Sequence, residues 1–253
     1  FPYTTLFRST MNAIAWHPKR GFHDPYHGQA DIAKKTIRCV GKASERMQED
    51  ALRILRALRF HCTLHFTIEE ETVQAIRTHA HLLSYISRER IREEFNRILL
   101  QDYPDTLQLL KEMRVLDTIA AGYTKLMNKE QNNPWHIYDV FTHTDVALNH
   151  TKGMALEGKL AIIFHDTGKP ACETLDADGI SHYYGHAQKS VELARCWLKK
   201  LHYDNRTIQR VLRCIAYHDY NLTPKKSTLR RYLSKFDNQL EDALLALDVQ
   251  LAD

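Results

Sequence analysis

Hydrophobic residues along the chain follow two different periods, and the change between them falls near Gly41. Before it, a short apolar run at 11–16, a turn with Pro and Gly at 17–21 and an extended segment at 22–25 predict a β-hairpin. Residues 36–40 predict one more strand. After Gly41, apolar residues recur about every 3.6 positions, which predicts that the rest of the chain is helical.

The helical pattern begins at Ser44 and runs to about Phe60, with Arg53, Arg56 and Arg59 recurring every third position on one side. Further helices are predicted at 69–83, 88–101, 103–112, 136–150, 157–166, 184–201, 204–218, 226–234 and 238–252. The predicted fold class is therefore mainly α, with a short N-terminal β-hairpin, a helical middle part and an all-α C-terminal domain. The polar segment 125–134 is the best candidate for a boundary between the two halves.

Composition narrows the class of protein without identifying it. The 253 residues are 43% hydrophobic and 26% charged, which predicts a globular protein with a substantial core. No apolar run is long enough to cross a bilayer, so no membrane association is expected. The five cysteines occur singly, which indicates reduced thiols and a cytoplasmic location. A net charge of +4 permits a phosphate-bearing partner without requiring one.

The first candidate site lies on the helix predicted from Ser44. Asp50 and Arg53 are three residues apart, so a helix would place an acceptor and a donor side by side, suited to the edge of a nucleobase. Arg56 and Arg59 would extend positive charge toward phosphates. Spacing alone favours a simpler interpretation, an exposed helix stabilised by ion pairs that each contribute a few tenths of a kcal/mol.

The second candidate site consists of histidines and aspartates within or at the ends of apolar helices in the C-terminal half. They are His143, His165, Asp166, His186, His218 and Asp253. Imidazoles and carboxylates from different helices suit a divalent cation with open coordination positions for water and a phosphate oxygen, which is hydrolytic chemistry. For any single histidine, an ordinary hydrogen-bonded residue is the commoner interpretation.

Four motifs in order resemble the class II tRNA nucleotidyltransferase and poly(A) polymerase family. They are residues 10–15, residues 24–28 with Asp31, residues 46–60 and residues 87–94. The resemblance implies that Asp50 and Arg53 pair with the base of an incoming CTP or ATP, that Arg56 and Arg59 help to hold the nucleotide, and that Asn12 lies on its sugar side. Residues 87–94 would brace this region, which is the neck of the family.

The N-terminal sequence departs from the family pattern. The strand before Asn12 usually reads Arg-Arg-Asp-Phe-Thr, whereas residues 6–10 read Leu-Phe-Arg-Ser-Thr, and residues 1–9 resemble a translated sequencing adaptor. The catalytic head of the family, whose paired aspartates hold Mg²⁺, is not found before this point. We therefore expect a fragment that cannot add nucleotides, and elongation of a tRNA lacking CCA by the purified chain would contradict this.

The C-terminal half resembles the HD phosphohydrolase superfamily, named for adjacent residues such as His165 and Asp166. The resemblance implies the metal ligands His143, His165, Asp166 and Asp253, with His165 and Asp166 central to catalysis. His186 and His218 would bind a phosphate or a second ion. Residues 133–136 with Asp139 match the version of this domain fused to bacterial CCA-adding enzymes.

Together these resemblances imply three parts: a head remnant at 10–41, a neck that recognises nucleotides and binds RNA at 42–125, and an HD domain at 133–253 that is truncated at its C-terminus. The implied function is that of a CCA-adding tRNA nucleotidyltransferase fragment, with tRNA, CTP and ATP as partners, Mg²⁺ for nucleotidyl transfer and Mn²⁺, Ni²⁺ or Mg²⁺ in the HD site. One alternative is a poly(A) polymerase of the same class, although such enzymes usually carry an unrelated C-terminal extension. Others are a stand-alone HD phosphodiesterase and an HD half that is a non-catalytic tRNA-binding arm.

Overall fold

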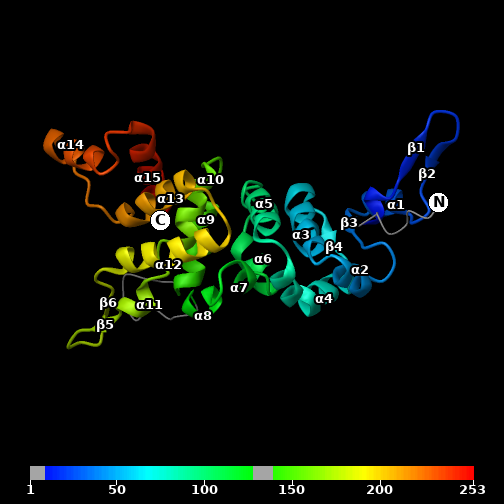
Figure 1. Ribbon diagram of the computed structural model, residues 1–253, viewed down its shortest axis with the longest axis horizontal. Helices are drawn as coiled ribbons and strands as arrows, with labels where there is room; N and C mark the ends of the chain where they lie inside the picture. The colour runs from blue at the N-terminus through cyan, green and yellow to red at the C-terminus, as the bar shows by residue number, and fades with distance from the viewer. Residues whose placement is uncertain (1–8, 128–138) are drawn as a thin grey trace. The chain divides into compact units, whose positions relative to one another are not determined.

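The computed structural model describes residues 9–127 and 139–253, and the chain divides into two compact units (Figure 1). Unit 1 contains residues up to 103 together with 109–118, and unit 2 contains residues 104–108 and 119–253. The predicted mainly-α class is confirmed. None of the helices in the described ranges combines the length and apolar composition that a membrane crossing needs. The 133–136 motif lies outside the described residues, as do the interpreted adaptor at 1–9, except for Ser9, and most of the predicted boundary segment.

Unit 1 begins with short elements and continues with helices. Its elements are the 3-10 helix η1 (Thr10–Asn12), β1 (Ala15–His17), β2 (Gly21–His23), α1 (Gly28–Ala33), β3 (Thr36–Ile37), α2 (Ala43–Glu49), α3 (Leu52–Leu64), β4 (Thr67–Ile68), α4 (Glu70–His79), the 3-10 helix η2 (Ala80–Tyr85) and α5 (Arg88–Leu99). Two further helices, α6 (Thr106–Glu112) and α7 (Leu116–Ile119), lie where the chain passes between the units. The predicted hairpin is confirmed as the antiparallel pair β1–β2, with Trp16 opposite Phe22 and with Gly21 at a φ of 70° after its turn.

The prediction of one helix from Ser44 to Phe60 is wrong, because the helix breaks at Asp50. The backbone of Asp50 is extended, with φ −153° and ψ 99°, and it separates α2 from α3. The side-chain Oδ1 of Asp50 accepts a hydrogen bond from the backbone N of Leu52 at 3.1 Å. Asp50 therefore starts α3 in the manner of an N-terminal capping residue, and it does not share a continuous helical face with Arg53.

The core of unit 1 lies mainly between α3 and α5, which pack against each other. Ile54, Leu55 and Leu58 of α3 and Ile91 and Ile98 of α5 are fully buried. The strand predicted at 36–40 is observed only as β3, which pairs in parallel with β4, a strand that was not predicted.

Unit 2 is a helical domain with one small hairpin. Its elements are α8 (Tyr123–Met127), α9 (Val140–Asn149), α10 (Leu156–Phe164), α11 (Lys169–Cys172), β5 (Thr174–Leu175), β6 (Ser181–His182), α12 (His186–Lys200), α13 (Asn205–Tyr217), α14 (Lys226–Ser234) and α15 (Leu240–Ala252). The β5–β6 hairpin corrects the prediction of an all-α C-terminal domain. Its turn is built on Asp176, whose Oδ1 accepts hydrogen bonds from the backbone N of Asp178 and of Ile180.

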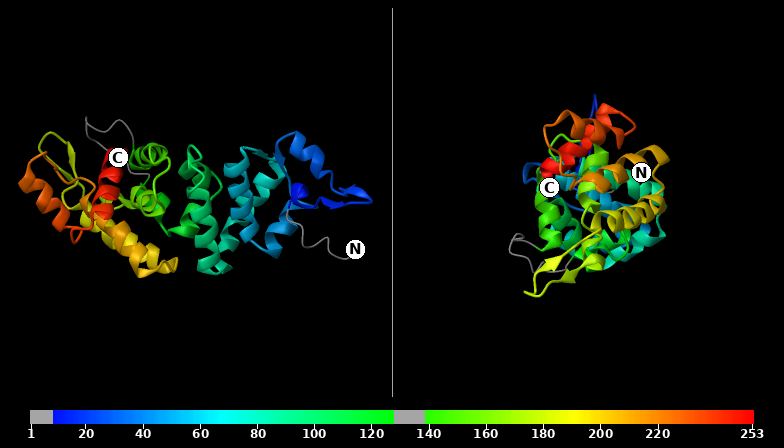
Figure 2. Two further views of the ribbon diagram at one scale, coloured as in Figure 1. Left: turned by 90° about the horizontal axis from the view of Figure 1, so that it is seen from above. Right: turned by 90° about the vertical axis from the view of Figure 1, so that its left-hand side faces the viewer.

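Helix α10 is the centre of unit 2. All its residues from 158 to 164 are buried, as expected of a helix that is surrounded by protein. It packs against α9, α13 and α15, and the last of these, drawn in red in Figure 2, carries the chain to its end at Asp253. Phe164 also contacts Trp197 of α12, with ring centroids 5.3 Å apart.

Candidate functional site

The structure brings together all the histidines and aspartates that were expected to bind metal in unit 2. They are His143 in α9, His165 and Asp166 directly after α10, His186 at the start of α12, His218 directly after α13, and Asp253 directly after α15. We call these six residues the HD cluster. Except for His143 and His186, each is delivered at the C-terminal end of a helix, where the last carbonyl groups carry partial negative charge that favours a cation.

Four members of the HD cluster form a first potential ligand group. The Nε2 of His143 lies 2.7 Å from Asp253 Oδ1 and 3.6 Å from Asp166 Oδ2. The Nε2 of His165 lies 2.9 Å from the same Asp253 oxygen and 3.3 Å from Asp166 Oδ2. Two imidazole nitrogens and two carboxylate oxygens therefore face one point, as metal ligands do.

A second group lies on the other side of Asp166. The Nε2 of His186 is 3.4 Å from Asp166 Oδ1, and the Nε2 of His218 is 3.9 Å from it. The two Nε2 atoms are 3.2 Å apart. Asp166 is therefore the residue that the two groups share, with one carboxylate oxygen turned toward each.

Local hydrogen bonds fix the orientation of three imidazoles. The Nδ1 atoms of His165, His186 and His218 lie 2.7–2.9 Å from the carbonyl oxygen of the residue three positions earlier. A carbonyl oxygen can only accept, so Nδ1 carries a proton, and each ring presents the lone pair of Nε2 to the cluster when it is neutral. Metal-binding histidines are commonly oriented in this way.

Buried polar atoms in the HD cluster are left without hydrogen-bond partners. They are Nε2 of His165 and both carboxylate oxygens of Asp166, on residues that are 0% and 1% exposed. Lys169 Nζ lies 2.6 Å from Asp166 Oδ2 as an ion pair, outside hydrogen-bonding geometry. Buried polar atoms are rarely left in this state, and a divalent cation would satisfy them, so the residues present fit such an ion.

The electrostatics of the HD cluster also favour positive charge. Burial opposes the imidazolium form of His165, but the carboxylates of Asp166 and Asp253 outweigh it and raise the pKa of His165 to about 10. Burial likewise opposes the charge on both carboxylates, yet His165 holds their pKa values well below the usual range. The pKa of His218 is lowered, first by burial and then by the charge of His165. The raised pKa thus favours a proton on His165, and a cation bound at the HD cluster would replace this proton.

Gly168 controls the approach of α12 to this site. A Cβ atom at Gly168 would lie 2.3 Å from the carbonyl oxygen of His186 and 2.7 Å from the backbone N of Ser190. The backbone N of Gly168 donates a hydrogen bond to Ser190 Oγ at 2.8 Å. Only a residue without a side chain therefore allows α12 to place His186 beside Asp166.

We expect Gly168→Ala to destabilise unit 2 by about 1–3 kcal/mol, because backbone atoms of α12 must move to admit the methyl group. The same movement should displace His186 and weaken metal binding, which isothermal titration with Mn²⁺ would measure alongside urea denaturation. Gly122→Ala is the control for metal binding: its Cβ would meet nothing within 4 Å, so it should lose stability through its φ of 79° and keep its metal affinity. Unchanged metal affinity and stability in Gly168→Ala would contradict the prediction.

The candidate nucleotide-binding residues of unit 1 lie around the start of α3. Asp50 Oδ2 accepts a hydrogen bond from Arg90 Nη2 at 3.1 Å. Arg53 Nη1 donates to Glu49 Oε2 at 2.6 Å and to the carbonyl oxygen of Arg46 at 2.9 Å. Each of the two side chains is therefore held in place by a neighbour.

A single buried carboxylate holds the other arginines of α3. Glu94 of α5, which is 4% exposed, accepts a hydrogen bond from Arg59 Nε at 2.7 Å and lies 3.9 Å from Arg56 Nη1. Arg53 and Arg56 line a cavity of about 20 Å³ together with Phe60, enough for about one water molecule. Asp50, Arg59 and the exposed Asn12 are not among the residues that line it.

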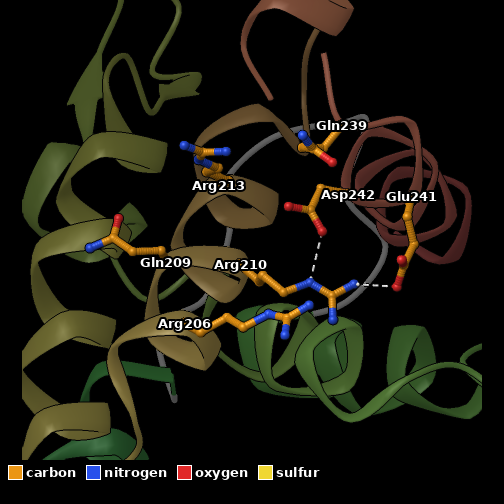
Figure 3. A pocket seen from close by; sticks show the side chains of 7 residues that line it. All are labelled: Arg206, Gln209, Arg210, Arg213, Gln239, Glu241 and Asp242. Atoms are coloured by element: carbon orange, nitrogen blue, oxygen red, sulfur yellow. Dashed lines mark hydrogen bonds and ion pairs between the residues drawn. The ribbon is translucent and has the colours of Figure 1, made fainter. Parts of the chain in front are cut away.

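A larger cavity of about 320 Å³ in unit 2 was not anticipated from the sequence (Figure 3). Its lining residues are Arg206, Gln209, Arg210 and Arg213 of α13 and Gln239, Glu241 and Asp242 at the start of α15. Arg210 donates hydrogen bonds to Asp242 at 2.8 Å, to Glu157 of α10 at 2.7 Å and to Glu241 at 3.1 Å. Arg213 is paired with Asp237. Because carboxylates offset these arginines, the arrangement connects helices and does not form an anion site.

Comparisons with known proteins agree with the motifs. A family described as "Probable RNA and SrmB- binding site of polymerase A" matches residues 65–125. An A-adding tRNA nucleotidyltransferase of Deinococcus radiodurans is 29% identical over 96% of this chain and 57% of its own length. A CC-adding tRNA nucleotidyltransferase of Thermus thermophilus is 30% identical over 94% of this chain and 57% of its own length.

A solved structure is also similar, that of the Bacillus stearothermophilus CCA-adding enzyme in complex with CTP. It is 26% identical, with a TM-score of 0.71, and the match covers 98% of this chain and 54% of that chain. The chain thus spans a little more than half the length of these relatives. The resemblance that the ordered motifs indicated is confirmed at the level of homologues and structural neighbours.

Proposed function

We propose that this chain, whose relatives and structural neighbours are tRNA nucleotidyltransferases, is the part of such an enzyme that carries its nucleotide-recognition neck and an HD phosphohydrolase domain. The proposed activity of the whole enzyme is the addition of CCA, or part of it, to tRNA 3′ ends from CTP and ATP with Mg²⁺. One relative is A-adding and the other CC-adding, so the nucleotides added by this protein must be measured. A poly(A) polymerase is the alternative, and the HD cluster argues against it.

The neck proposal is supported by the way residues outside α3 fix an acceptor, Asp50, and a donor, Arg53, around the start of that helix. Asp50 is held by Arg90, and Arg53 is held by Glu49 and the Arg46 carbonyl. Recognition of a base edge by hydrogen bonds is stronger when the positions of the groups are set before the ligand arrives, because a loose side chain must lose entropy on binding. Asn12, Arg56 and Arg59 are proposed to contact the rest of the nucleotide.

Arg53→Ala tests this proposal through nucleotide affinity. Loss of a charge-assisted hydrogen bond is expected to weaken CTP and ATP binding by about tenfold or more, measured by equilibrium dialysis with Mg²⁺. Arg77→Ala, which removes an arginine that donates to the carbonyl oxygen of Glu112 on the same unit, should leave affinity unchanged. If Arg53→Ala lowers stability but not nucleotide affinity, the role of Arg53 is purely structural.

We further propose that unit 2 is a metal-dependent phosphohydrolase. The observation that supports it is the set of buried atoms on His165 and Asp166 that have no hydrogen-bond partner inside the HD cluster. His143, His165, Asp166 and Asp253 would hold a divalent cation such as Mn²⁺, Ni²⁺ or Mg²⁺. When bound, such a cation lowers the pKa of a water molecule and polarises a phosphate.

His186 and His218 have a more specific role in this proposal. Their Nδ1 protons point to backbone carbonyls, so a neutral Nε2 can accept or coordinate but cannot donate to a phosphate oxygen. This geometry favours a second cation at the pair over a direct phosphate contact. Lys169, paired with Asp166, would supply positive charge beside the phosphate.

The proposed substrates are phosphodiesters at RNA ends, such as 2′,3′-cyclic phosphates, since the unit adjoins a tRNA-end polymerase. Hydrolysis of 2′,3′-cAMP with added Mn²⁺ or Ni²⁺ is the direct test. If unit 2 is instead a non-catalytic tRNA-binding arm, no metal will support hydrolysis, and tRNA affinity will fall steeply with salt. A cytoplasmic location completes the proposal, supported by five free cysteines.

A further inference from the structure

A half-buried histidine and an exposed tyrosine form an aromatic pair close to His186 of the HD cluster along the chain, where the β5–β6 hairpin leads into α12. Tyr184 is 79% exposed, although it is only two residues from His186. Its ring stacks on that of His182, with centroids 5.5 Å apart and planes 7° from parallel. Two residues span at most about 7 Å of backbone, so the Cα of Tyr184 lies within about 7 Å of the Cα of His186, a member of the HD cluster.

The hairpin holds this pair in place. His182 Nε2 lies 2.9 Å from Asp176 Oδ2, while the other oxygen of Asp176 accepts the two backbone hydrogen bonds that form the turn. The contact with Asp176 thereby fixes the ring of His182, on which the ring of Tyr184 stacks. The ring of Tyr184 does not have to be ordered from a freely rotating state, which lowers the entropy lost when another ring stacks on it.

Tyr183, the residue before Tyr184, is turned inward. Tyr183 is 9% exposed, and Lys169 Nζ lies 5.7 Å from the centroid of its ring. The carbonyl oxygen of Tyr183 orients the His186 imidazole. Tyr183 is therefore buried beside Lys169, the ion-pair partner of Asp166, whereas Tyr184 presents a flat ring to solvent two residues before His186.

We infer that Tyr184, supported by His182, is a stacking platform for the nucleobase of a phosphoester whose phosphate lies at the HD cluster. The substrate class would then be nucleotides and RNA ends and not simple phosphate esters. This inference rests on the proposed phosphohydrolase function. Stacking tolerates any base, because every base has a π-face, so we expect little base specificity and at most a modest preference for purines.

The test compares substrates with and without a base. In Tyr184→Ala, KM for 2′,3′-cAMP should rise about tenfold with kcat unchanged, while hydrolysis of glycerol 1,2-cyclic phosphate, which has no base, should be unaffected. Tyr184→Phe should behave as the wild type, because it keeps the ring. Tyr85→Ala is the matched control, since Tyr85 is 82% exposed and belongs to unit 1.

Two results would overturn the inference: an unchanged KM for 2′,3′-cAMP in Tyr184→Ala, or an equal loss on both substrates, which would mean that Tyr184 shapes the cluster. A second measurement separates the inference from the proposed function. Titration of 2′-AMP and of ribose 2-phosphate in the presence of Mn²⁺ should show tighter binding of the nucleotide, and Tyr184→Ala should abolish that difference. If the wild type hydrolyses neither cyclic substrate, the hydrolase proposal fails, while this binding comparison still decides whether the platform exists.

Discussion

Replacing Asp166 with asparagine is expected to abolish cation binding at the HD cluster and to lower hydrolysis of 2′,3′-cAMP by more than about 100-fold, the upper range for losing a residue that only supports a metal ligand. Asp166 has one oxygen toward His143 and His165 and the other toward His186 and His218. The amide keeps the volume of the carboxylate but presents an NH₂ group to one side, so at least one ligand group loses an acceptor.

Isothermal titration with Mn²⁺ or Ni²⁺ and a hydrolysis assay would measure the two effects, and His165→Ala should show both of them. The control is Asp219→Asn, because Asp219 also follows a histidine directly but is exposed and does not belong to the HD cluster. Circular dichroism would verify that the variants fold. Full activity in both Asp166→Asn and His165→Ala would refute the metal assignment.

Replacing Arg210 with methionine is expected to lower the free energy of unfolding of unit 2 by about 2–4 kcal/mol, since removing one partner leaves charges that are partly buried and unpaired. The side chain of Arg210 is 14% exposed, and those of Glu157 and Asp242 are 19% and 22% exposed. Methionine retains much of the packing of the arginine stem, so the change isolates the guanidinium.

Urea denaturation would measure the loss. Arg206→Met is the matched control, because Arg206 is exposed on the same helix, lines the same cavity and is one turn away. Adding Glu157→Gln and Asp242→Asn to Arg210→Met should recover much of the stability, since the unpaired charges are then removed. A failure of this rescue would show that Arg210 acts through packing and not through its ion pairs.

The ion pairs of Arg210 join three helices that also supply four of the six members of the HD cluster. Glu157 precedes His165 by eight residues, and Arg210 precedes His218 by eight residues. Eight residues of helix span about 12 Å, so both intervals are slightly more than two turns. The ion pairs of Arg210 therefore connect α10, α13 and α15 to one another. The C-terminal ends of the same three helices supply His165, Asp166, His218 and Asp253. We expect Arg210→Met to weaken cation binding as well as stability.

Amphipathic helices and the N-terminal hairpin could be predicted from the sequence, whereas the break at Asp50 and the two-residue strands could not. The helix expected at 226–234 has those bounds as α14, and the one expected at 88–101 is α5. The break at Asp50 was missed because apolar residues keep the helical period across it, although aspartate is a frequent capping residue. The two-residue strands β3 and β4 are too short to show alternation, and their pairing depends on contacts far apart in the sequence.

The residue types of the HD cluster could be predicted, but its geometry could not. The sequence indicated His143, His165, Asp166 and Asp253 as one set through family resemblance, with His186 and His218 nearby. It contained no information on which nitrogen faces the centre, because that depends on hydrogen bonds to backbone carbonyls in the folded chain. The partners of Arg210 and the position of Tyr184 beside His186 likewise follow from tertiary structure.

The span of sequence that the HD cluster brings together has a consequence for folding. His143 and Asp253 are 110 residues apart, and their side chains lie 2.7 Å from each other. A cation that binds both would close a loop containing nearly all of unit 2, and it would bind the folded chain in preference to the unfolded one. At a free concentration of about 100 times its dissociation constant it would add about 2.7 kcal/mol to the folding free energy. The lifetime of folded unit 2 would then depend on the concentration of free metal. A chelator would shorten that lifetime and would also stop hydrolysis at the HD cluster.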